Sequence, residues 1–404
     1  PEGFIRWTET DNLAECLRLM SPSLTPRLDV KPLTSHRFDF NEAEKGYSLI
    51  MEKSEPHLGV VLTYPNQKEK FSDTPIFSTP KIKTQNCVLG VIGAGNFTRN
   101  ILLPELSKVP GVTLHTIVSR KGITASHSQE KYGFINSGSS EKEIFNNPAI
   151  NAVVVTTRHD SHAQLTSEAL LAGKSVLVEK PLGLNLEEIS VVRQAREKAD
   201  GFFQIGFNRR FAPLSIKAKT RLISISSPKF MLFRINAGPI SKTSWINSSI
   251  EGGGRIIGEV CHFIDLARFF ADSPIVSVMA DTPSIIDNPG ENVMTTIRFE
   301  DGSLAAIAYT SLGDAVYPKE NYEIFAGGTV INIDNFRSLM IASGGTTHRS
   351  TKRLDKGFGG SLRAFVAAVN AGGPSPLREE ELMETSCATI AVVESLRSGK
   401  QIDL

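Results

Sequence analysis

The chain has 404 residues, of which 40% are hydrophobic and 22% charged, and its formal net charge at pH 7 is +1. This length exceeds one ordinary hydrophobic core, so we expect two or three domains. The balanced charge argues against nucleic acid or a membrane surface as partner, and no segment approaches the ~20 consecutive apolar residues of a membrane helix.

The four cysteines lie far apart, without the spacing of a metal site or the density of a disulfide scaffold: Cys16, Cys87, Cys261 and Cys387. We therefore expect no metal ion, and a reducing cytoplasm as the location. The N-terminus has no secretory signal pattern. The chain begins with Pro1 rather than Met, which indicates a fragment or a split reading frame.

Residues 1–65 form a first region that is poor in large apolar groups. The spacing of its hydrophobic residues predicts helices over 12–20 and 41–50 and a strand over 58–63. A region this short would have a marginal core by itself. Residues 66–85 are polar and rich in Pro, Ser, Thr and Lys, which is typical of a linker.

Residues 86–206 alternate between strand and helix patterns. Runs such as Ala152–Val155 and Val176–Val178 are hydrophobic throughout, as in parallel strands buried on both faces. Gly173 is suited to a helix C-terminus and Asn185 to a helix N-cap. The predicted elements are strand 88–92, helix 97–108, strand 112–118, helix 123–132, strand 152–156, helix 161–172, strand 175–179, helix 186–199 and strand 202–206.

A glycine-rich turn follows the first of these strands. Gly93 and Gly95 permit a sharp bend and a close approach of a pyrophosphate, and the helix beginning near Asn96 and Phe97 directs free N–H groups at that anion. Thr98 stands where Gly or Ala is usual, and its β-branched side chain is expected to loosen helix–strand packing. In its strand–helix context the turn predicts dinucleotide binding.

Residues 207–404 have the pattern of an α+β domain, with several strands of alternating polarity. Asp301-Gly302 predicts a hairpin turn between two of them. The predicted elements are strands 230–236, 275–280, 294–299, 304–309 and 322–326, and helices 255–270, 361–370 and 379–398.

Several motifs occur in a set order: Gly93-Ala-Gly95, His162, Gly173-Lys-Ser-Val-Leu-Val-Glu-Lys-Pro181, Arg210-Phe-Ala-Pro213, and Gly252-Gly-Gly254 followed by His262. On these motifs, residues 86–404 resemble the Gfo/Idh/MocA family of NAD(P)-dependent oxidoreductases, whose members act mainly on sugars, inositols and nucleotide sugars. The resemblance implies an α/β fold, in which a Rossmann domain precedes an α+β domain with a large open, mostly antiparallel sheet. It also implies a homo-oligomer, a dimer or tetramer, packed through that sheet.

The first region carries a second resemblance. On Leu28–Phe38 and Asn41–Lys45, residues 1–65 are similar to the C-terminal end of a zinc-dependent medium-chain alcohol dehydrogenase. The arrangement resembles oxidoreductases that fuse such a module to a Gfo/Idh/MocA module. The zinc ligands and nucleotide fold of that module are missing from this sequence, so we expect no catalysis from residues 1–65.

Cofactor choice depends on the end of the second predicted strand of residues 86–206. An acidic residue there would bind the ribose 2′-OH of NAD, whereas Ser119 and Arg120 suit a 2′-phosphate. NADP(H) is therefore favoured and NAD(H) is possible, because the Arg side chain can also stack on adenine or lie solvated. Further cofactor contacts are expected on the nicotinamide side, at Thr156, Thr157, Arg158, His159, His162 and Glu179.

Two residues are expected to carry the chemistry. Lys180 follows a buried strand at the ligand-binding edge of the sheet, where its ammonium can stabilise a developing oxyanion, the role that the resemblance implies. His262 would take the hydroxyl proton, because imidazole titrates near neutrality. The family often has an Asp four residues before this His, where this chain has Gly258 and then Glu259. Asp265, on the same helical face as His262, would orient the ring or bind substrate.

The candidate substrate contacts are Asn208, Arg210, Trp245, Glu259 and Asp265. Arg210 matches the family, and with the adjacent Arg209 it would suit an anionic substrate such as a nucleotide sugar. Trp245 either stacks on a sugar ring or lies buried.

We therefore predict an NAD(P)-dependent oxidoreductase that transfers hydride between nicotinamide and a carbinol or carbonyl carbon of a sugar or nucleotide sugar, in polysaccharide or nucleotide-sugar synthesis. Two alternatives stay open. One keeps the family but changes the reaction to imine or enamine reduction, or to recycling of a bound cofactor. The other is a non-catalytic nucleotide-binding scaffold, which the missing Asp makes plausible.

Overall fold

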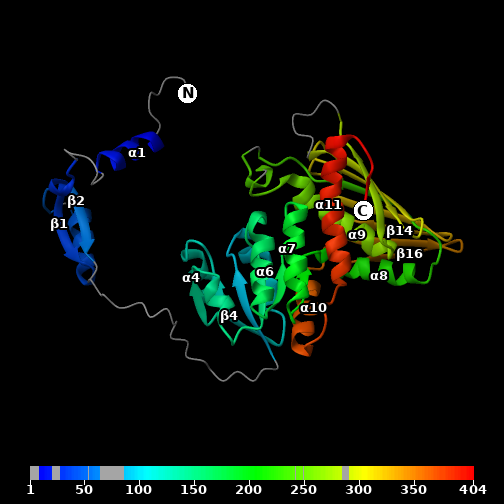
Figure 1. Ribbon diagram of the computed structural model, residues 1–404, viewed down its shortest axis with the longest axis horizontal. Helices are drawn as coiled ribbons and strands as arrows, with labels where there is room; N and C mark the ends of the chain where they lie inside the picture. The colour runs from blue at the N-terminus through cyan, green and yellow to red at the C-terminus, as the bar shows by residue number, and fades with distance from the viewer. Residues whose placement is uncertain are drawn as a thin grey trace. The chain divides into compact units, whose positions relative to one another are not determined.

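The computed structural model describes residues 9–20, 28–52, 54–63, 86–241, 243–248, 250–283 and 291–404. It divides into two compact units, Pro1–Phe77 and Ser78–Leu404 (Figure 1). The linker expected over 66–85 lies outside the described residues. No helix in the described part of the chain is long and apolar enough to cross a membrane.

The first unit is a small β–α–β arrangement. Strands β1 (Thr34–Asp39) and β2 (Gly59–Thr63) pair in parallel, with α2 (Ala43–Glu52) between them in sequence and α1 (Glu9–Leu19) before them. Both helices and β2 were predicted, but β1 was not, because its six residues are mostly polar and half of them are exposed. Among the described residues of this unit only two are buried, so its core is as marginal as expected.

The second unit begins with a six-stranded parallel sheet in the order β5-β4-β3-β6-β7-β8. Its strands are β3 (Cys87–Ile92), β4 (Val112–Val118), β5 (Asn136–Gly138), β6 (Ala152–Val155), β7 (Ser175–Val178) and β8 (Phe203–Ile205). The chain order reverses between β3 and β6, and open sheets of this kind bind ligands outside the carboxyl ends of the strands at that point.

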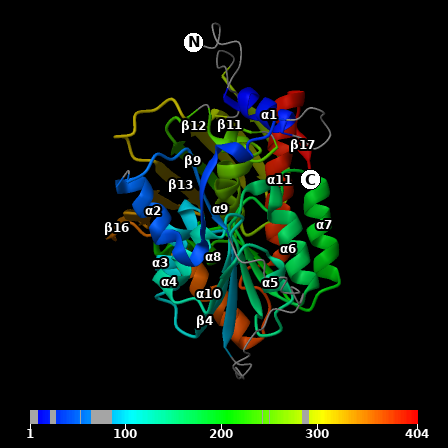
Figure 2. The same cartoon turned by 90° about the vertical axis from the view of Figure 1, so that its left-hand side faces the viewer.

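Helices cover both faces of this sheet, because alternate residues of each strand point to opposite sides. Along β6, Val153 and Val155 pack into one apolar cluster and Ala152 and Val154 into another. Figure 2 shows α6 and α7 on one side of the sheet and α3 and α4 on the other. The helices are α3 (Leu103–Leu106), α4 (Ile123–Tyr132), α5 (Lys142–Phe145), α6 (His162–Leu171) and α7 (Leu186–Glu197).

The C-terminal part forms a nine-stranded sheet in the order β16-β15-β14-β13-β9-β12-β11-β10-β17. Every neighbouring pair is antiparallel except β9 and β12. Its strands are β9 (Phe230–Asn236), β10 (Ile275–Asp281), β11 (Val293–Phe299), β12 (Leu304–Thr310), β13 (Glu320–Ala326), β14 (Thr329–Asp334), β15 (Ser338–Ser343), β16 (Thr346–Thr351) and β17 (Ile402–Asp403). The predicted fold class is therefore confirmed.

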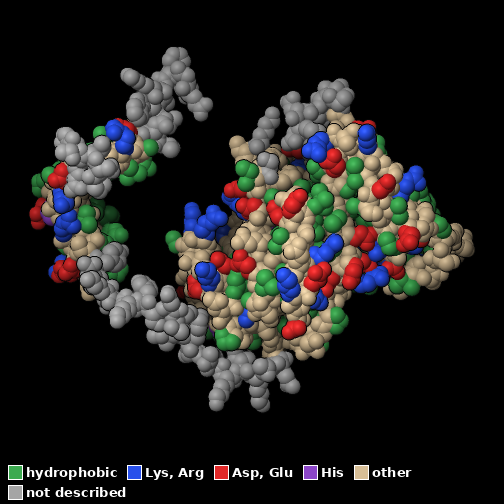
Figure 3. Space-filling view, in the orientation of Figure 1, with side chains coloured by type: hydrophobic (Ala, Val, Ile, Leu, Met, Phe, Trp, Pro, Cys, Tyr) green, Lys and Arg blue, Asp and Glu red, His purple; other side chains and the backbone are tan. Residues whose placement is uncertain are grey.

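One face of the large sheet packs on helices α8 (Pro213–Ile223), α9 (Cys261–Ala271) and α11 (Glu379–Ser398). The other face carries exposed apolar side chains, among them Phe230 and Met294, which are 47% and 51% exposed. Figure 3 shows acidic and basic side chains interspersed over the visible surface of this unit, without a region of one sign.

The last helices return to the first sheet. Leu362 and Phe365 of α10 (Phe358–Ala371) join one of the two apolar clusters on that sheet, and Leu382 of α11 joins the other. Glu379 at the start of α11 accepts a hydrogen bond from the backbone N–H of Phe203 in β8, at 2.8 Å. Residues of α10 and α11, more than 150 positions after β8 in the chain, therefore cover the parallel sheet.

Local sequence signals account for most boundaries. The side chain of Asn185 accepts the N–H of Glu188 and caps α7, and Gly302 takes a positive φ of 84° in the predicted hairpin turn. In the second unit the prediction missed β5, α5, α8 and the strands β14 to β17. Of these, β16 is almost wholly exposed and mixed in polarity, so it lacks the alternation that marks a strand.

Candidate active site

The glycine turn after β3 has the shape that a dinucleotide phosphate requires. Gly93 has a φ of 105°, and a Cβ added to it would lie 2.7 Å from the carbonyl oxygen of Thr156, so only glycine fits. A Cβ at Gly95 would meet no atom within 4 Å. The first glycine therefore makes the bend, and the second leaves open space in which a pyrophosphate fits.

Thr98 does not loosen this turn, contrary to the expectation from its β-branched side chain. It is fully buried, and its hydroxyl lies 2.8 Å from the hydroxyl of Thr156. The Thr156 hydroxyl also donates to the carbonyl of Gly93, at 3.0 Å. The paired hydroxyls of Thr98 and Thr156 thus take the place of the usual Gly or Ala contact between helix and strand. Thr156 is therefore bonded to the turn itself.

The end of β4 carries the two residues expected at the adenosine ribose. The Ser119 hydroxyl lies 2.8 Å from the hydroxyl of Thr124. Arg120 is exposed, and its guanidinium makes no ion pair within the described residues. This strand end therefore presents a free cation and no carboxylate.

Around the expected nicotinamide position, Phe97, Glu179, Asn208 and Phe358 line one small pocket. The Phe97 and Phe358 rings pack at 5.8 Å, whereas the side chain of Asn96 accepts a hydrogen bond from Arg99. Burial raises the pKa of Glu179 to about 7. The amide oxygen of Asn208 is buried without a hydrogen-bond partner in the described structure. An orphaned acceptor of this kind suits the carboxamide of a nicotinamide.

Lys180 follows β7, and its ammonium donates to the carbonyl oxygen of Gly258 at 2.5 Å. Gly258 lies in a continuous helical run from η8 (Ile256–Val260) into α9. His262 stands one turn further along this run, on the same face as Gly258. The fold therefore brings Lys180 and His262 together from the two halves of the unit.

His262 is poised as a neutral base. Its Nδ1 atom is buried without a hydrogen-bond partner among the described residues, and its ring packs edge-on against Phe207, with centroids 6.1 Å apart. Burial, followed by the charges of Arg209 and Lys180, holds the pKa of His262 well below its usual range. The imidazole is therefore uncharged at neutral pH and able to accept a proton.

The space beside Gly258 is filled by another imidazole. A Cβ at Gly258 would lie 2.9 Å from Cε1 of His159. The His159 Nδ1 atom lies 2.7 Å from the carbonyl oxygen of Gly252, and the ring meets Trp245 edge-on at 4.7 Å. Burial lowers the pKa of His159 to about 3, so it is neutral. The His159 ring therefore occupies the space that a side chain at position 258 would need.

His162 connects the two loops that flank the site. Its Nδ1 lies 2.7 Å from the carbonyl oxygen of Pro181, and its Nε2 lies 3.2 Å from that of Thr157. The ring is buried, which lowers its pKa. His162 is thus a positioning residue for the Lys180 loop. Thr157 also accepts a hydrogen bond from Ser161 through its hydroxyl.

Two of the expected substrate contacts are instead paired within the core. Both carboxylate oxygens of Asp265 accept from Nε of Arg210 at 2.9 Å, and Arg210 also bonds Glu381. Asp265 is fully buried and does not orient His262, which corrects that expectation. The companion Arg209 is likewise paired with Glu320, so neither guanidinium is free for an anionic substrate.

The remaining candidates line the approach to the site. Glu259 accepts from Arg255 and from the hydroxyl of Tyr309, and these groups and Lys319 lower its pKa against the effect of burial. Trp245 is half-buried, and the guanidinium of Arg158 lies over its indole ring, 5.6 Å from the centroid of that ring. Arg158 also forms an exposed ion pair with Glu251, which replaces the expected nicotinamide contact.

Sequence motifs did not point to three further polar residues here. Glu320 is fully buried and accepts hydrogen bonds from Arg209 and from Lys356, the latter at 2.6 Å. These cations lower the pKa of Glu320 well below its usual range, against the effect of burial. Lys319 precedes it in sequence. Nothing in the local pattern distinguishes these residues from solvated surface charges.

The chain is similar in sequence to known oxidoreductases. Residues 88–207 match a family model described as an oxidoreductase family with an NAD-binding Rossmann fold, and residues 230–328 match a model of the Gfo/Idh/MocA C-terminal domain. The chain is 24% identical over 331 residues to myo-inositol 2-dehydrogenase of Thermotoga maritima, covering 78% of this chain and 98% of that protein. It is 25% identical over 301 residues to levoglucosan dehydrogenase of Pseudarthrobacter phenanthrenivorans, covering 64% and 76%.

Solved structures show the same fold. A levoglucosan dehydrogenase in complex with NADH and levoglucosan superposes with a TM-score of 0.70 at 21% identity, covering 79% of this chain and 99% of that one. An aldose-aldose oxidoreductase from Caulobacter crescentus superposes with a TM-score of 0.71 at 18% identity, covering 79% and 100%.

We predict that Arg210→Met destabilises the protein by about 3–5 kcal/mol, because Asp265 is left as a buried carboxylate without its partner. The midpoint of urea unfolding measures this loss. Arg298→Met, at an exposed position of β11, is the control, with an expected change within about 0.5 kcal/mol. Equal midpoints for the two variants would contradict a structural role for Arg210.

A second prediction concerns the coupling of Gly258 and His159. Gly258→Asp alone is expected to destabilise the protein by about 1–3 kcal/mol, because its Cβ overlaps the His159 ring. His159→Asn opens that space, so the double variant should lose less than the sum of the two single losses. Urea unfolding of the four proteins tests this, and strict additivity would refute the coupling.

Proposed function

The chain belongs to the Gfo/Idh/MocA family of NAD-binding oxidoreductases, and we propose from this that it catalyses hydride transfer between nicotinamide and a carbinol or carbonyl carbon of a sugar-like substrate. One observation carries the proposal: Lys180 donates to the carbonyl of Gly258, one turn before His262 in the same helical run, and the Nδ1 of His262 has no partner among the described residues.

In the oxidative direction, the bound nicotinamide supplies the acceptor for the hydride that leaves the carbinol carbon. Lys180 donates a hydrogen bond to the substrate oxygen and stabilises the negative charge that develops on it. His262, uncharged at neutral pH, accepts the hydroxyl proton as the carbonyl forms. In the reverse direction the same imidazole returns that proton.

The substrate class follows from chemistry and relatives. Two relatives are named as dehydrogenases of myo-inositol and of levoglucosan, and the pair Lys180 and His262 would serve a carbon that bears a hydroxyl here. We propose a sugar, polyol or nucleotide sugar as substrate, with Asn208, Trp245 and Glu259 lining its approach. A role in polysaccharide or nucleotide-sugar synthesis is part of this proposal.

NADP(H) is the preferred cofactor in this proposal. Arg120 is exposed and unpaired among the described residues, as a 2′-phosphate would require, and Ser119 lies beside it. No carboxylate at this strand end would repel the phosphate.

Two further proposals concern the chain as a whole. The exposed apolar face of the large sheet would form the contact of a homo-oligomer, a dimer or tetramer. The first unit, with its parallel β1 and β2 and its small core, would be the C-terminal remnant of a medium-chain dehydrogenase without activity of its own. The scattered cysteines favour a reducing cytoplasm.

We predict that Lys180→Met lowers kcat by about 10²–10³, the loss found when one oxyanion donor is removed. The affinity for NADPH, measured by its fluorescence on binding, should stay within about threefold because the phosphate turn is untouched. Lys198→Met, an exposed position at the end of α7, is the matched control. Normal turnover by Lys180→Met would disprove the assigned role, and a chain that binds no dinucleotide would disprove the function.

A further prediction tests cofactor preference. Arg120→Gln should weaken NADPH binding about tenfold, the effect of one charged hydrogen bond, and leave NADH binding unchanged. Lys121→Gln, at the next residue, should change neither. If NADPH and NADH weaken together in Arg120→Gln, the side chain stacks on adenine instead.

A further inference from the structure

The large sheet has an open cavity of about 470 Å³ at the end nearest the candidate active site. Its walls come from the end of β9, the segment before β13, and the turn after β14. These segments meet because β13 pairs antiparallel with both neighbours: Glu320 opposes Ile235, and Asn321 opposes Asp334. A cavity of this size is within the range of small-molecule sites.

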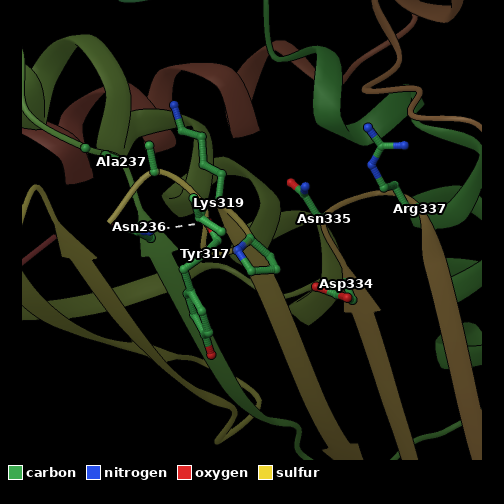
Figure 4. Close-up of a pocket in the computed structure, with 11 residues that line it drawn as sticks. Asn236, Ala237, Tyr317, Lys319, Asp334, Asn335 and Arg337 are labelled. Atoms are coloured by element: carbon green, nitrogen blue, oxygen red, sulfur yellow. Dashed lines mark hydrogen bonds between the residues drawn. The ribbon is translucent and has the colours of Figure 1, made fainter. Parts of the chain in front are cut away.

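Two cations line this cavity, and neither forms an ion pair in the described structure, although the carboxylates of Glu259 and Glu320 interact electrostatically with Lys319. Lys319 and Arg337 project from the same end of the sheet, to either side of Asn335 (Figure 4). Neither side chain forms an ion pair or hydrogen bond within the described residues, including with Asp334, the carboxylate that also lines the cavity. Lys319 is half-buried and Arg337 is exposed.

Charged side chains connect this cavity to Lys180 and His262. Glu320, next to Lys319, is shared by two cations, Arg209 and Lys356, so one carboxylate balances two positive charges. Lys180 bonds the neutral carbonyl of Gly258. The charges of Lys319 and Lys356 both reach His262 and contribute to its lowered pKa. Glu259, which accepts from Arg255 and also interacts with Lys319, is the other carboxylate of this group, so the cations outnumber the two carboxylates Glu259 and Glu320.

We propose that this cavity binds the anionic group, a carboxylate or a phosphate, of an acidic sugar substrate, with Lys319 as its principal contact and Arg337 at the entrance. The sugar ring would lie between Lys319 and the Lys180–His262 pair, so that the reacting carbon faces the nicotinamide. The half-buried Lys319 ammonium makes no ion pair or hydrogen bond in the described structure, so its donors are available to an anion, which is the physical reason to expect one there.

This inference rests on the proposed function, so the experiment separates the two. NADPH-loaded protein is titrated calorimetrically with D-glucuronate, D-glucose 6-phosphate and neutral D-glucose. We expect at least one acid to bind about tenfold or more tightly than glucose, as one charged hydrogen bond provides, and the difference to shrink with added salt. The ratio of glucuronate to glucose 6-phosphate affinity identifies the anionic group.

Lys319→Gln should abolish the preference for the acid, and Arg337→Gln should reduce it. Lys352→Gln, an exposed position outside the cavity, should retain it. Equal affinities for acids and glucose in the wild-type chain, or an undiminished preference in Lys319→Gln, would overturn the inference. A protein that binds NADPH and oxidises neutral sugars without preferring acids contradicts the inference alone. A protein that binds neither NADPH nor NADH contradicts the proposed function.

Discussion

The hydrogen bond from Lys180 to the carbonyl of Gly258 is the constraint on which the site depends. It joins the end of β7 in the parallel sheet to the helical run that carries His262. An ammonium on a flexible four-carbon stem has no fixed direction by itself, so its position must come from its acceptor and its own loop. His162 supplies the second restraint, because its buried ring lies within hydrogen-bond distance of the Pro181 carbonyl, the shorter of its two carbonyl contacts.

The glycine at position 258 changes the electrostatics around this bond. At this position Lys180 bonds a backbone carbonyl, which carries no charge to balance the ammonium. The neutral ring of His159 occupies the vacated space and adds no charge. Together with Arg209, Lys319 and Lys356, the result is a catalytic pocket that disfavours a protonated His262 and favours a negatively charged ligand.

The two halves of the second unit are bound to each other as one structure. Helices α10 and α11 are last in the chain, yet they pack on opposite faces of the first sheet. Arg210, which follows β8, is held by Asp265 of α9 and Glu381 of α11. These buried ion pairs join the segment after β8 to α9 and α11, at a desolvation cost that only full pairing offsets.

Local pattern was sufficient for much of this description. Glycine conformation, buried hydrophobic runs and caps are short-range effects, so the phosphate turn, the strand–helix alternation, the Asn185 cap and the Asp301-Gly302 hairpin were all predictable from neighbouring residues. The motif order gave the family and, with it, the pairing of Lys180 with His262.

Long-range pairing decided the rest, because a side chain's role depends on which partner the fold brings within reach. Arg210 and Asp265 have the residue types of a binding site, but they neutralise each other in the core. Lys319 and Glu320 are consecutive, yet one is unpaired beside a cavity and the other is buried between two cations. The filling of the Gly258 space by His159, about 100 positions earlier in the chain, has no local signature at all.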